Sequence, residues 1–326
     1  MSLDRSTERP YRDIMSKRHP IQRSAVTALL VWTGLWGAGL IGVPSPARTD
    51  PAEIGSFLYQ LQEIDLAAIA RTCYDLVVID YSADGSEHGE FAAEQIAKLA
   101  ESPTGHKIVL AYLSIGEAES YRFYWKPEWR PGHPFWLDAE NPSWDGNYKV
   151  RFWVAEWQRI VLRYVDRLID AGFHGAYLDL IDAYQEYKAR GRDTAATEMI
   201  AFVEAIRVHA LARDPGFLLF VQNAAALLDV DPTYVELVDG IGQEDIHYGY
   251  LGDDLMTPPA VTAYMVGRLD RFLAAGKPVL TIDYATTPTH IDRAYVAARA
   301  NGYVAFVTTR ALDTLVVHPG HDPCAD

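Results

Sequence analysis

The chain has few cysteines, no clustered histidines and fewer basic than acidic side chains, and each of these scarcities argues against a class of protein. Its ten histidines are scattered, without an HxH or HExxH pair, so we expect no tight metal site and no cofactor. The 29 Lys and Arg residues are outnumbered by 44 Asp and Glu residues, which leaves a net charge of −15. Binding to nucleic acid needs a basic surface that neutralises phosphates, so we predict no nucleic-acid partner.

Sequence fingerprints of several enzyme classes are missing as well. There is no GxSxG elbow for a serine nucleophile, and no dinucleotide-binding or P-loop fingerprint. Neither Cys73 nor Cys324 lies at the end of a predicted strand, which disfavours covalent acyl chemistry. Outside the cytoplasm these two cysteines could form a disulfide. They could also stay as a buried thiol and a free thiol in the tail, and the sequence leaves both alternatives open.

The first 47 residues have the layout of an export signal. Residues 1–23 contain six Lys or Arg and three Asp or Glu, residues 24–43 are uncharged, and small residues follow at 45–47. The apolar run is long enough to remain as an uncleaved anchor with its basic side inside, but its four glycines favour cleavage. We therefore expect a protein that is secreted or held on the outer face of the membrane. Membrane contact would come only through this segment if it stays uncleaved.

Residues 48–326 are predicted to form a single α/β domain. Eight short apolar segments, rich in β-branched and aromatic residues, are typical of strands buried on both faces of a parallel sheet. They are residues 57–62, 75–81, 107–115, 175–181, 217–223, 238–244, 278–284 and 303–309. Amphipathic segments predict helices over residues 90–101, 149–171, 193–213, 259–275 and 289–301. This alternation favours a (β/α)8 TIM barrel, and a doubly wound open sheet is the second choice.

One connection, residues 116–148, is unusually long and aromatic. Long loops after the strands of such a barrel lie on its catalytic face, where aromatic rings can stack on the apolar faces of sugars. The loop could instead fold around a small core of its own, and we expect both, with about a third of its rings touching ligand. The aromatic residues are Tyr121, Phe123, Tyr124, Trp125, Trp129, Phe135, Trp136, Trp144 and Tyr148.

The polar residues at the predicted strand ends are mostly acidic. In a TIM barrel such positions are the first candidates for catalysis, and glycoside hydrolysis needs two carboxyl groups across the scissile bond. The strand-end residues are Gln60, Asp80, Ser114, Glu117, Asp179, Asp182, Asn223, Glu244, Asp283 and Arg310. This composition indicates a carbohydrate-cleaving barrel.

Five segments of the chain together resemble a known family, the endo-α-1,4-polygalactosaminidases of glycoside hydrolase family 114. The two most specific are YLSIGEAESYRFYW (112–125) and GFHGAYLDLIDAYQ (172–185), and the others are QLQEID (60–65), YDLVVIDYSADG (74–85) and QEDI (243–246). The likeness extends from about Phe57 to Leu315. It implies a TIM barrel that hydrolyses α-1,4-linked galactosamine polymers, with Asp179 and Glu244 as the catalytic pair. The chain is also similar to α-galactosidase-type barrels, whose fourth-strand Asp is the nucleophile and whose sixth-strand carboxyl is the acid/base.

These roles set requirements on the surroundings of the two carboxyl groups. As nucleophile, Asp179 must be ionised, so we expect hydrogen-bond donors around it, from Tyr112 or Gln60. Glu244 must carry a proton that it can donate to the leaving oxygen. The structural alternatives are that Asp179 caps a helix and that Glu244 pairs with a lysine or arginine.

The favoured hypothesis is a retaining endo-glycosidase that acts on an extracellular polysaccharide of the cationic amino-sugar type. Carboxylates near the pair could bind sugar hydroxyls or the amine of galactosamine, although Asp182 could instead cap a turn. The alternatives are a carbohydrate-binding barrel without turnover, attached to the cell surface, and an isomerase or lyase acting on small sugars. The expected substrate-binding residues are Gln60, Asp80, Tyr112, Glu117, Tyr124, Trp125, Asp182, Asn223, Asp283 and Tyr284.

Overall fold

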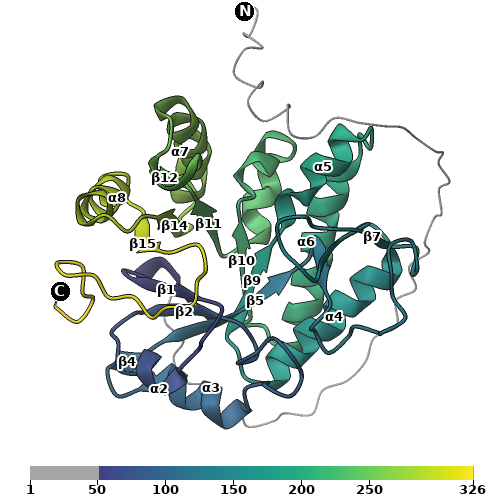
Figure 1. Ribbon diagram of the computed structural model, residues 1–326, viewed down its shortest axis with the longest axis horizontal. Helices are drawn as coiled ribbons and strands as arrows, with labels where there is room; N and C mark the ends of the chain where they lie inside the picture. Colours follow the sequence, from purple (N-terminus) through teal and green to yellow (C-terminus); the bar gives the residue numbers. More distant parts are fainter. Residues whose placement is uncertain (1–50, 326) are drawn as a thin grey trace, which may run out of the picture.

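The computed structural model describes residues 51–325 of the chain (Figure 1). The predicted export segment, residues 1–47, therefore lies outside the described residues. Within residues 51–325, no helix is long and apolar enough to cross a bilayer.

Eight parallel strands form a nearly closed barrel, which confirms the TIM-barrel prediction. Neighbouring strands in the sheet follow the order of the chain without a reversal, and the two end strands lie against each other. A doubly wound sheet would reverse its strand order, so this second choice was wrong. Every strand falls within one of the predicted segments. The strands are β1 (Phe57–Gln60), β2 (Leu76–Ile79), β5 (Ile108–Ser114), β9 (Gly175–Asp179), β10 (Leu218–Gln222), β11 (Gly240–Glu244), β14 (Val279–Tyr284) and β15 (Val304–Thr308).

Helices surround the strands, as Figure 1 shows. The α-helices are α2 (Leu66–Ile69), α3 (Ala93–Ala100), α4 (Ala155–Asp170), α5 (Tyr184–Ala189), α6 (Ala195–Arg213), α7 (Pro259–Ala274) and α8 (Pro288–Ala300). Short 3-10 helices span Pro51–Glu53, Ile181–Ala183, Ala225–Asp229 and Pro232–Leu237. The helix predicted over residues 149–171 was wrong at its start, because residues 147–150 pair as a strand with the preceding loop instead. Trp157, Tyr164 and Leu168 are among the residues that α4 buries against the barrel.

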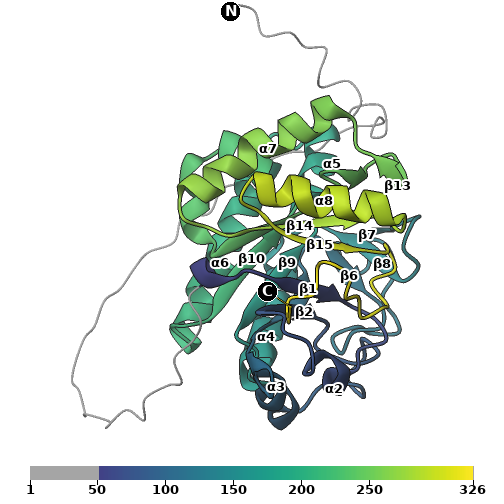
Figure 2. The same ribbon diagram turned by 90° about the vertical axis from the view of Figure 1, so that its left-hand side faces the viewer.

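Two β structures lie beyond the carboxyl ends of the barrel strands, on the right-hand side of Figure 2. The long loop after β5 forms a three-stranded sheet of β6 (Glu117–Glu119), β8 (Asn147–Val150) and β7 (Leu137–Glu140). The loop after β11 forms a hairpin of β12 (Tyr248–Gly249) and β13 (Gly252–Met256). A second small hairpin, β3 (Glu101–Ser102) and β4 (Gly105–His106), precedes β5. The sheet and the hairpin after β11 frame the mouth of the barrel.

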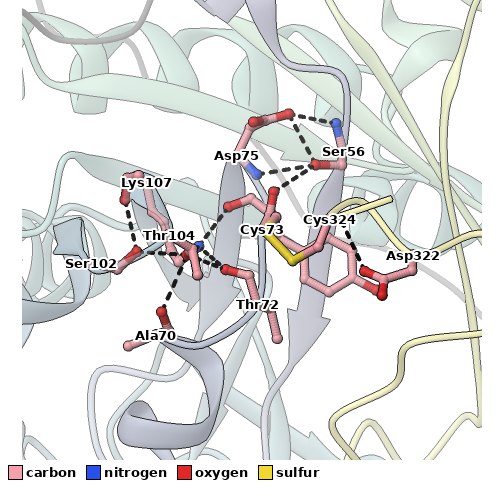
Figure 3. Close-up of a disulfide and its surroundings, with 12 residues drawn as sticks. Ser56, Ala70, Thr72, Cys73, Asp75, Ser102, Thr104, Lys107, Asp322 and Cys324 are labelled. Atoms are coloured by element: carbon pink, nitrogen blue, oxygen red, sulfur yellow. Dashed lines mark hydrogen bonds between the residues drawn. A yellow bond between two sulfur atoms is a disulfide. The ribbon is translucent and has the colours of Figure 1, made fainter. Parts of the chain in front are cut away.

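The C-terminal tail, residues 309–325, covers the seam between β15 and β1. The backbone N–H groups of Leu61 and Gln62 donate to the carbonyl of Leu312, at 2.8 and 3.1 Å. Further along, the Tyr74 hydroxyl donates to the carbonyl of Val316 at 2.7 Å. A disulfide between Cys73 and Cys324 then joins the tail to the segment just before β2 (Figure 3). The two cysteines that the sequence left open are therefore paired, and the tail occupies the place where an eighth helix would lie.

Candidate active site

The strand register decides which side chains point into the barrel. Because side chains alternate along a strand, residues two apart share a face, and register partners on neighbouring strands share it too. Asp179 is the register partner of Ser114, and Glu244 is the partner of Ile282. Both acids are the last residues of their strands, β9 and β11. The register therefore brings them to the same open end of the barrel, with β10 between their two strands.

Asp179 accepts hydrogen bonds from two sides. The Tyr112 hydroxyl donates to Oδ2 of Asp179 at 2.8 Å, as predicted. The backbone N–H of Leu180, a residue in the left-handed region at φ 55°, is the second donor. Burial and the nearby Glu244 carboxylate nevertheless raise the pKa of Asp179 to about 8. The donor expected from Gln60 was wrong: its amide donates to the carbonyls of Gln62 and Glu63.

Glu244 is held by donors from the two adjacent strands. Asn223 Nδ2 donates to Oε2 at 2.7 Å, and the Tyr284 hydroxyl donates to Oε1. The Oδ1 atom of Asn223 in turn accepts from the backbone N–H of Glu244 at 3.0 Å. Asn223 has a φ of 55°, and this turn lets its amide bridge to β11. The arginine near this position pairs with Asp245 instead of Glu244, so the salt-bridge alternative for Glu244 is not what the structure shows.

Three carboxyl groups interact electrostatically in this pocket. Burial first, and the Glu244 charge second, raise the pKa of Asp182 to about 6. Burial raises the pKa of the Tyr59 hydroxyl, and the negative charges of Asp179 and Glu244 raise it further. Tyr177 behaves in the same way. These electrostatic influences indicate that Asp179, Asp182 and Glu244 lie close to one another at the carboxyl ends of the barrel strands.

A glycine makes room for the floor of this pocket. The Tyr177 hydroxyl donates to Oε1 of Gln222, and both side chains extend across β11 at Gly242. A Cβ atom added at Gly242 would lie 1.6 Å from the Tyr177 hydroxyl oxygen and 2.5 Å from Gln222 Oε1. The Tyr59 ring packs on Tyr177, with 5.3 Å between ring centroids. The floor is thus an aromatic and amide layer that leaves no space for a side chain at position 242.

Of the ten residues expected to bind substrate, four lie at this pocket: Tyr112, Asp182, Asn223 and Tyr284. Gln60 and Asp283 have the opposite strand parity and point out of the barrel, towards its outer layer. Asp283 accepts from the backbone N–H groups of His247 and Tyr248, at 2.6 and 2.8 Å, and so anchors the start of the hairpin. Burial raises the pKa of Asp283 to about 7.

The other four expected residues lie in the long loop after β5, except Asp80, which directly follows β2. Asp80 forms a buried ion pair with Arg122 at 2.7 Å, and Arg122 also pairs with Glu119. Glu117 accepts from Asn141 at 2.8 Å. Tyr124 accepts from the backbone N–H of Glu119 and packs in the loop's own core, and Trp125 packs on Trp129 and Tyr148. The exposed rings of this loop are Tyr121, Phe135 and Trp144.

Three interior residues that the sequence analysis missed line the pocket: Tyr59, Tyr177 and Gln222. The signal that could have found them is alternation, since Tyr177 lies two residues before Asp179. In the part of the chain that the structure describes, no group of three His, Cys, Asp or Glu side chains is arranged to hold a metal ion.

A TIM barrel with a carboxyl pair at the mouth is the class of fold and site that glycoside hydrolases use. The family model of glycoside-hydrolase family GH114 matches residues 42–324, and the chain belongs to this family. A protein of Deinococcus radiodurans is 39% identical over 254 residues, which are 78% of this chain and 79% of that protein. A protein of Thermotoga maritima is 37% identical over 272 residues, 79% of this chain and 81% of that protein. Both relatives are described as uncharacterized.

Solved structures with the same fold include one glycoside hydrolase domain and one protein in complex with an amino sugar. The glycoside hydrolase domain of PelA from Pseudomonas aeruginosa has a TM-score of 0.61 and 23% identity, and the match covers 80% of this chain and 97% of that one. Ega3 from Aspergillus fumigatus, in complex with galactosamine, has a TM-score of 0.62 and 19% identity, covering 85% of this chain and 100% of that one. These likenesses establish the fold.

Proposed function

We propose that this protein hydrolyses an α-1,4-linked galactosamine-type polysaccharide with retention of configuration, with Asp179 as nucleophile and Glu244 as acid/base. The observation that carries the proposal is the electrostatic influence of Glu244 on Asp179 at the open end of the barrel. Two carboxyl groups that share one pocket do not both ionise readily, so one proton is held between them. A double displacement at a sugar requires such a pair, with one carboxyl ionised and the other protonated.

The reaction would proceed in two balanced steps. In the first, the Asp179 carboxylate bonds to the anomeric carbon as the bond to the leaving oxygen breaks, and Glu244 transfers its proton to that oxygen. In the second, Glu244 takes a proton from water, the water oxygen bonds to the anomeric carbon, and the bond to Asp179 breaks. Both carboxyl groups then return to their starting states. The Tyr112 and Asn223 side chains hold the two groups in place.

The location of the shared proton supports a cationic substrate. With the pKa of Asp179 at about 8, the shared proton rests on Asp179 near neutral pH, although a nucleophile must be ionised. An ammonium group bound beside Asp179 and Asp182 would favour their ionised forms. An amino sugar thus assists in preparing the catalytic pair. The galactosamine found with Ega3 agrees with this substrate class.

The decisive experiment is incubation with purified α-1,4-polygalactosamine, followed by mass spectrometry of the products. We expect Asp179→Asn and Glu244→Gln each to lower release of reducing ends by about 10³-fold or more with the fold intact. Azide separates the two roles: with an aryl α-glycoside of a galactosamine oligomer, Glu244→Ala should give an α-glycosyl azide and Asp179→Ala a β-glycosyl azide. Near-wild-type turnover in both amide variants would rule out this pair. Binding without cleavage by the wild type would favour a carbohydrate-binding barrel.

We further propose that the protein acts outside the cytoplasm, either secreted or held on the outer face of the membrane. The disulfide between Cys73 and Cys324 supports this, because disulfides persist in oxidising compartments. The signal-like composition of residues 1–47 is the second support. N-terminal sequencing of the exported protein tests the proposal, and recovery only from the cytoplasm would contradict it.

A further inference from the structure

We propose that Arg310 is a positioning residue for Glu244, which acts through the ring of Tyr284 and through the turn at Asp245. The inference rests on the proposed function, because it takes Glu244 to be the acid/base. Arg310 follows the end of β15 by two residues and belongs to the C-terminal tail. It is the only tail residue of the described chain for which a charged contact to the β11 loop is found.

The first connection runs through an aromatic ring. The guanidinium carbon of Arg310 lies 4.0 Å from the centroid of the Tyr284 ring, within the range of a cation–π interaction. The hydroxyl of the same tyrosine donates to Oε1 of Glu244. Burial raises the pKa of Tyr284, while the Arg310 charge works in the opposite direction. A cation on the ring face therefore makes the phenol a stronger donor to Glu244 and holds the ring in place.

The second connection fixes the turn that follows Glu244. Asp245 has a φ of 61°, in the left-handed region, which is unfavourable for a residue with a side chain. Arg310 Nη2 donates at 3.0 Å both to Oδ1 of Asp245 and to the carbonyl of Gly249. Arg310 Nε donates to Oδ1 of Asp253 at 2.8 Å. The arginine thus joins both ends of the hairpin loop to the strained turn.

The loop is shaped to admit this arginine. Gly249 has a φ of 121°, and a Cβ atom at this position would lie 2.0 Å from Asp245 Oδ1 and 3.1 Å from Arg310 Nη2. Only glycine leaves room for the Asp245–Arg310 pair. The ring contact and the three acceptors, which take the N–H groups of Nε and Nη2, tie the guanidinium to Tyr284 and to the loop after β11, and this arrangement indicates positioning of Glu244.

Other charged groups also act on the pocket, and a test must separate them from Arg310. Asp179, Asp182 and Tyr177 face Glu244 from β9 and the segment after it, and Tyr59 faces it from β1. Tyr284 and Asn223 contact it directly. Asp245 lies next to it, and burial raises the pKa of Asp245 to about 6 against the opposing charge of Arg310. Loss of Arg310 removes the one cation in this set, so ionisation of the carboxyl groups should require a higher pH.

The test compares Arg310→Met with a matched control, Arg268→Met. Arg268, on α7, lies 3.6 Å from the Tyr264 ring centroid and pairs with Asp229 of the 3-10 helix Ala225–Asp229, so it has the same kinds of contact without bonding to Tyr284 or Asp245. With α-1,4-polygalactosamine as substrate, Arg310→Met should lower kcat about 10-fold or more and change KM less than about 2-fold. The alkaline limb of its kcat/KM profile should move to higher pH, and Arg310→Lys should restore part of kcat. Unchanged kcat and an unchanged pH profile in Arg310→Met would overturn the proposal.

A second measurement does not depend on the substrate. Hydrogen exchange of the loop between β11 and α7 should become faster in Arg310→Met and stay unchanged in Arg268→Met, because the turn loses its cross-link. If the wild type cleaves no galactosamine polymer, the proposed function fails, while faster exchange in Arg310→Met still supports the role of Arg310 in holding the turn at Asp245. If the wild type is active and the exchange rates of wild type and Arg310→Met agree, this role of Arg310 is wrong.

Discussion

The hydroxyl of Tyr112, on β5, donates a 2.8 Å hydrogen bond to Asp179, on β9. The register partner of Tyr112 is Tyr177, two residues before Asp179, so the bond runs diagonally towards the open end of the barrel. This bond lowers the pKa of Asp179. Burial and the Glu244 charge raise the same pKa by more than the bond lowers it.

Removal of this donor should change the pH profile. In Tyr112→Phe the pKa of Asp179 rises, because its ionised form loses a stabilising hydrogen bond. We expect the acidic limb of kcat/KM, on which Asp179 ionises near pH 8 in the wild type, to move to higher pH. The rate at neutral pH should fall about 10-fold, since less of the enzyme has Asp179 ionised. An identical profile in the variant would show that Tyr112 does not support the nucleophile.

Stability should fall as the pH rises through the range where Asp179 titrates. The folded pKa of about 8 lies above the unfolded value of roughly 4, so the folded state binds more protons between these pH values. Asp179→Asn removes this dependence and should raise the melting temperature at pH 8 by about 2–6 °C, while at pH 4 the difference should disappear. Calorimetry of both proteins at several pH values measures it. An equal shift at pH 4 and pH 8 would contradict the role of the buried charge.

Gly242→Ala should disrupt the pocket floor. The added Cβ would meet the Tyr177 hydroxyl at 1.6 Å, so Tyr177 and Gln222 must move. We expect a loss of about 2 kcal/mol or more in the free energy of unfolding, together with most of the activity. Gly267→Ala, on α7, is the control: it has no atom within 4 Å of the added Cβ and should stabilise the helix by up to about 1 kcal/mol. Denaturant unfolding of both variants compares them.

The disulfide should stabilise the barrel seam. Cys73 and Cys324 are 251 residues apart, so their bond constrains a large loop of the unfolded chain. Cys73→Ser combined with Cys324→Ser should lower the free energy of unfolding by about 3–5 kcal/mol. The same loss on reduction of the wild type, and no further loss on reduction of the double variant, would attribute it to the bond. A melting temperature that does not respond to reduction would refute this prediction.

Most of the fold could be predicted from the pattern of strands, because a strand that is buried on both faces leaves a continuous apolar run in the sequence. All eight strands lie inside the segments predicted for them. The predicted start of the helix at residue 149 was wrong, because Asn147–Val150 pairs with β6. Neighbouring residues in the sequence do not reveal this partner. Gln60 and Asp283 were expected at the site because they end strands, yet their parity turns them outward. Position along a strand selects the end of the barrel, and parity selects the face.

By itself, the sequence determined an eight-strand α/β barrel with acidic residues at the strand ends, because hydrophobic periodicity and chain order are local properties. The tertiary structure decided which groups meet: Tyr59 beside both carboxyl groups, Cys73 bonded to Cys324, and Arg310 on the ring of Tyr284. These contacts join residues that are far apart in the chain. The first two contacts depend on closure of the barrel, which brings the first and last strands together, and the third depends on the pairing of β14 with β15; no local pattern records either.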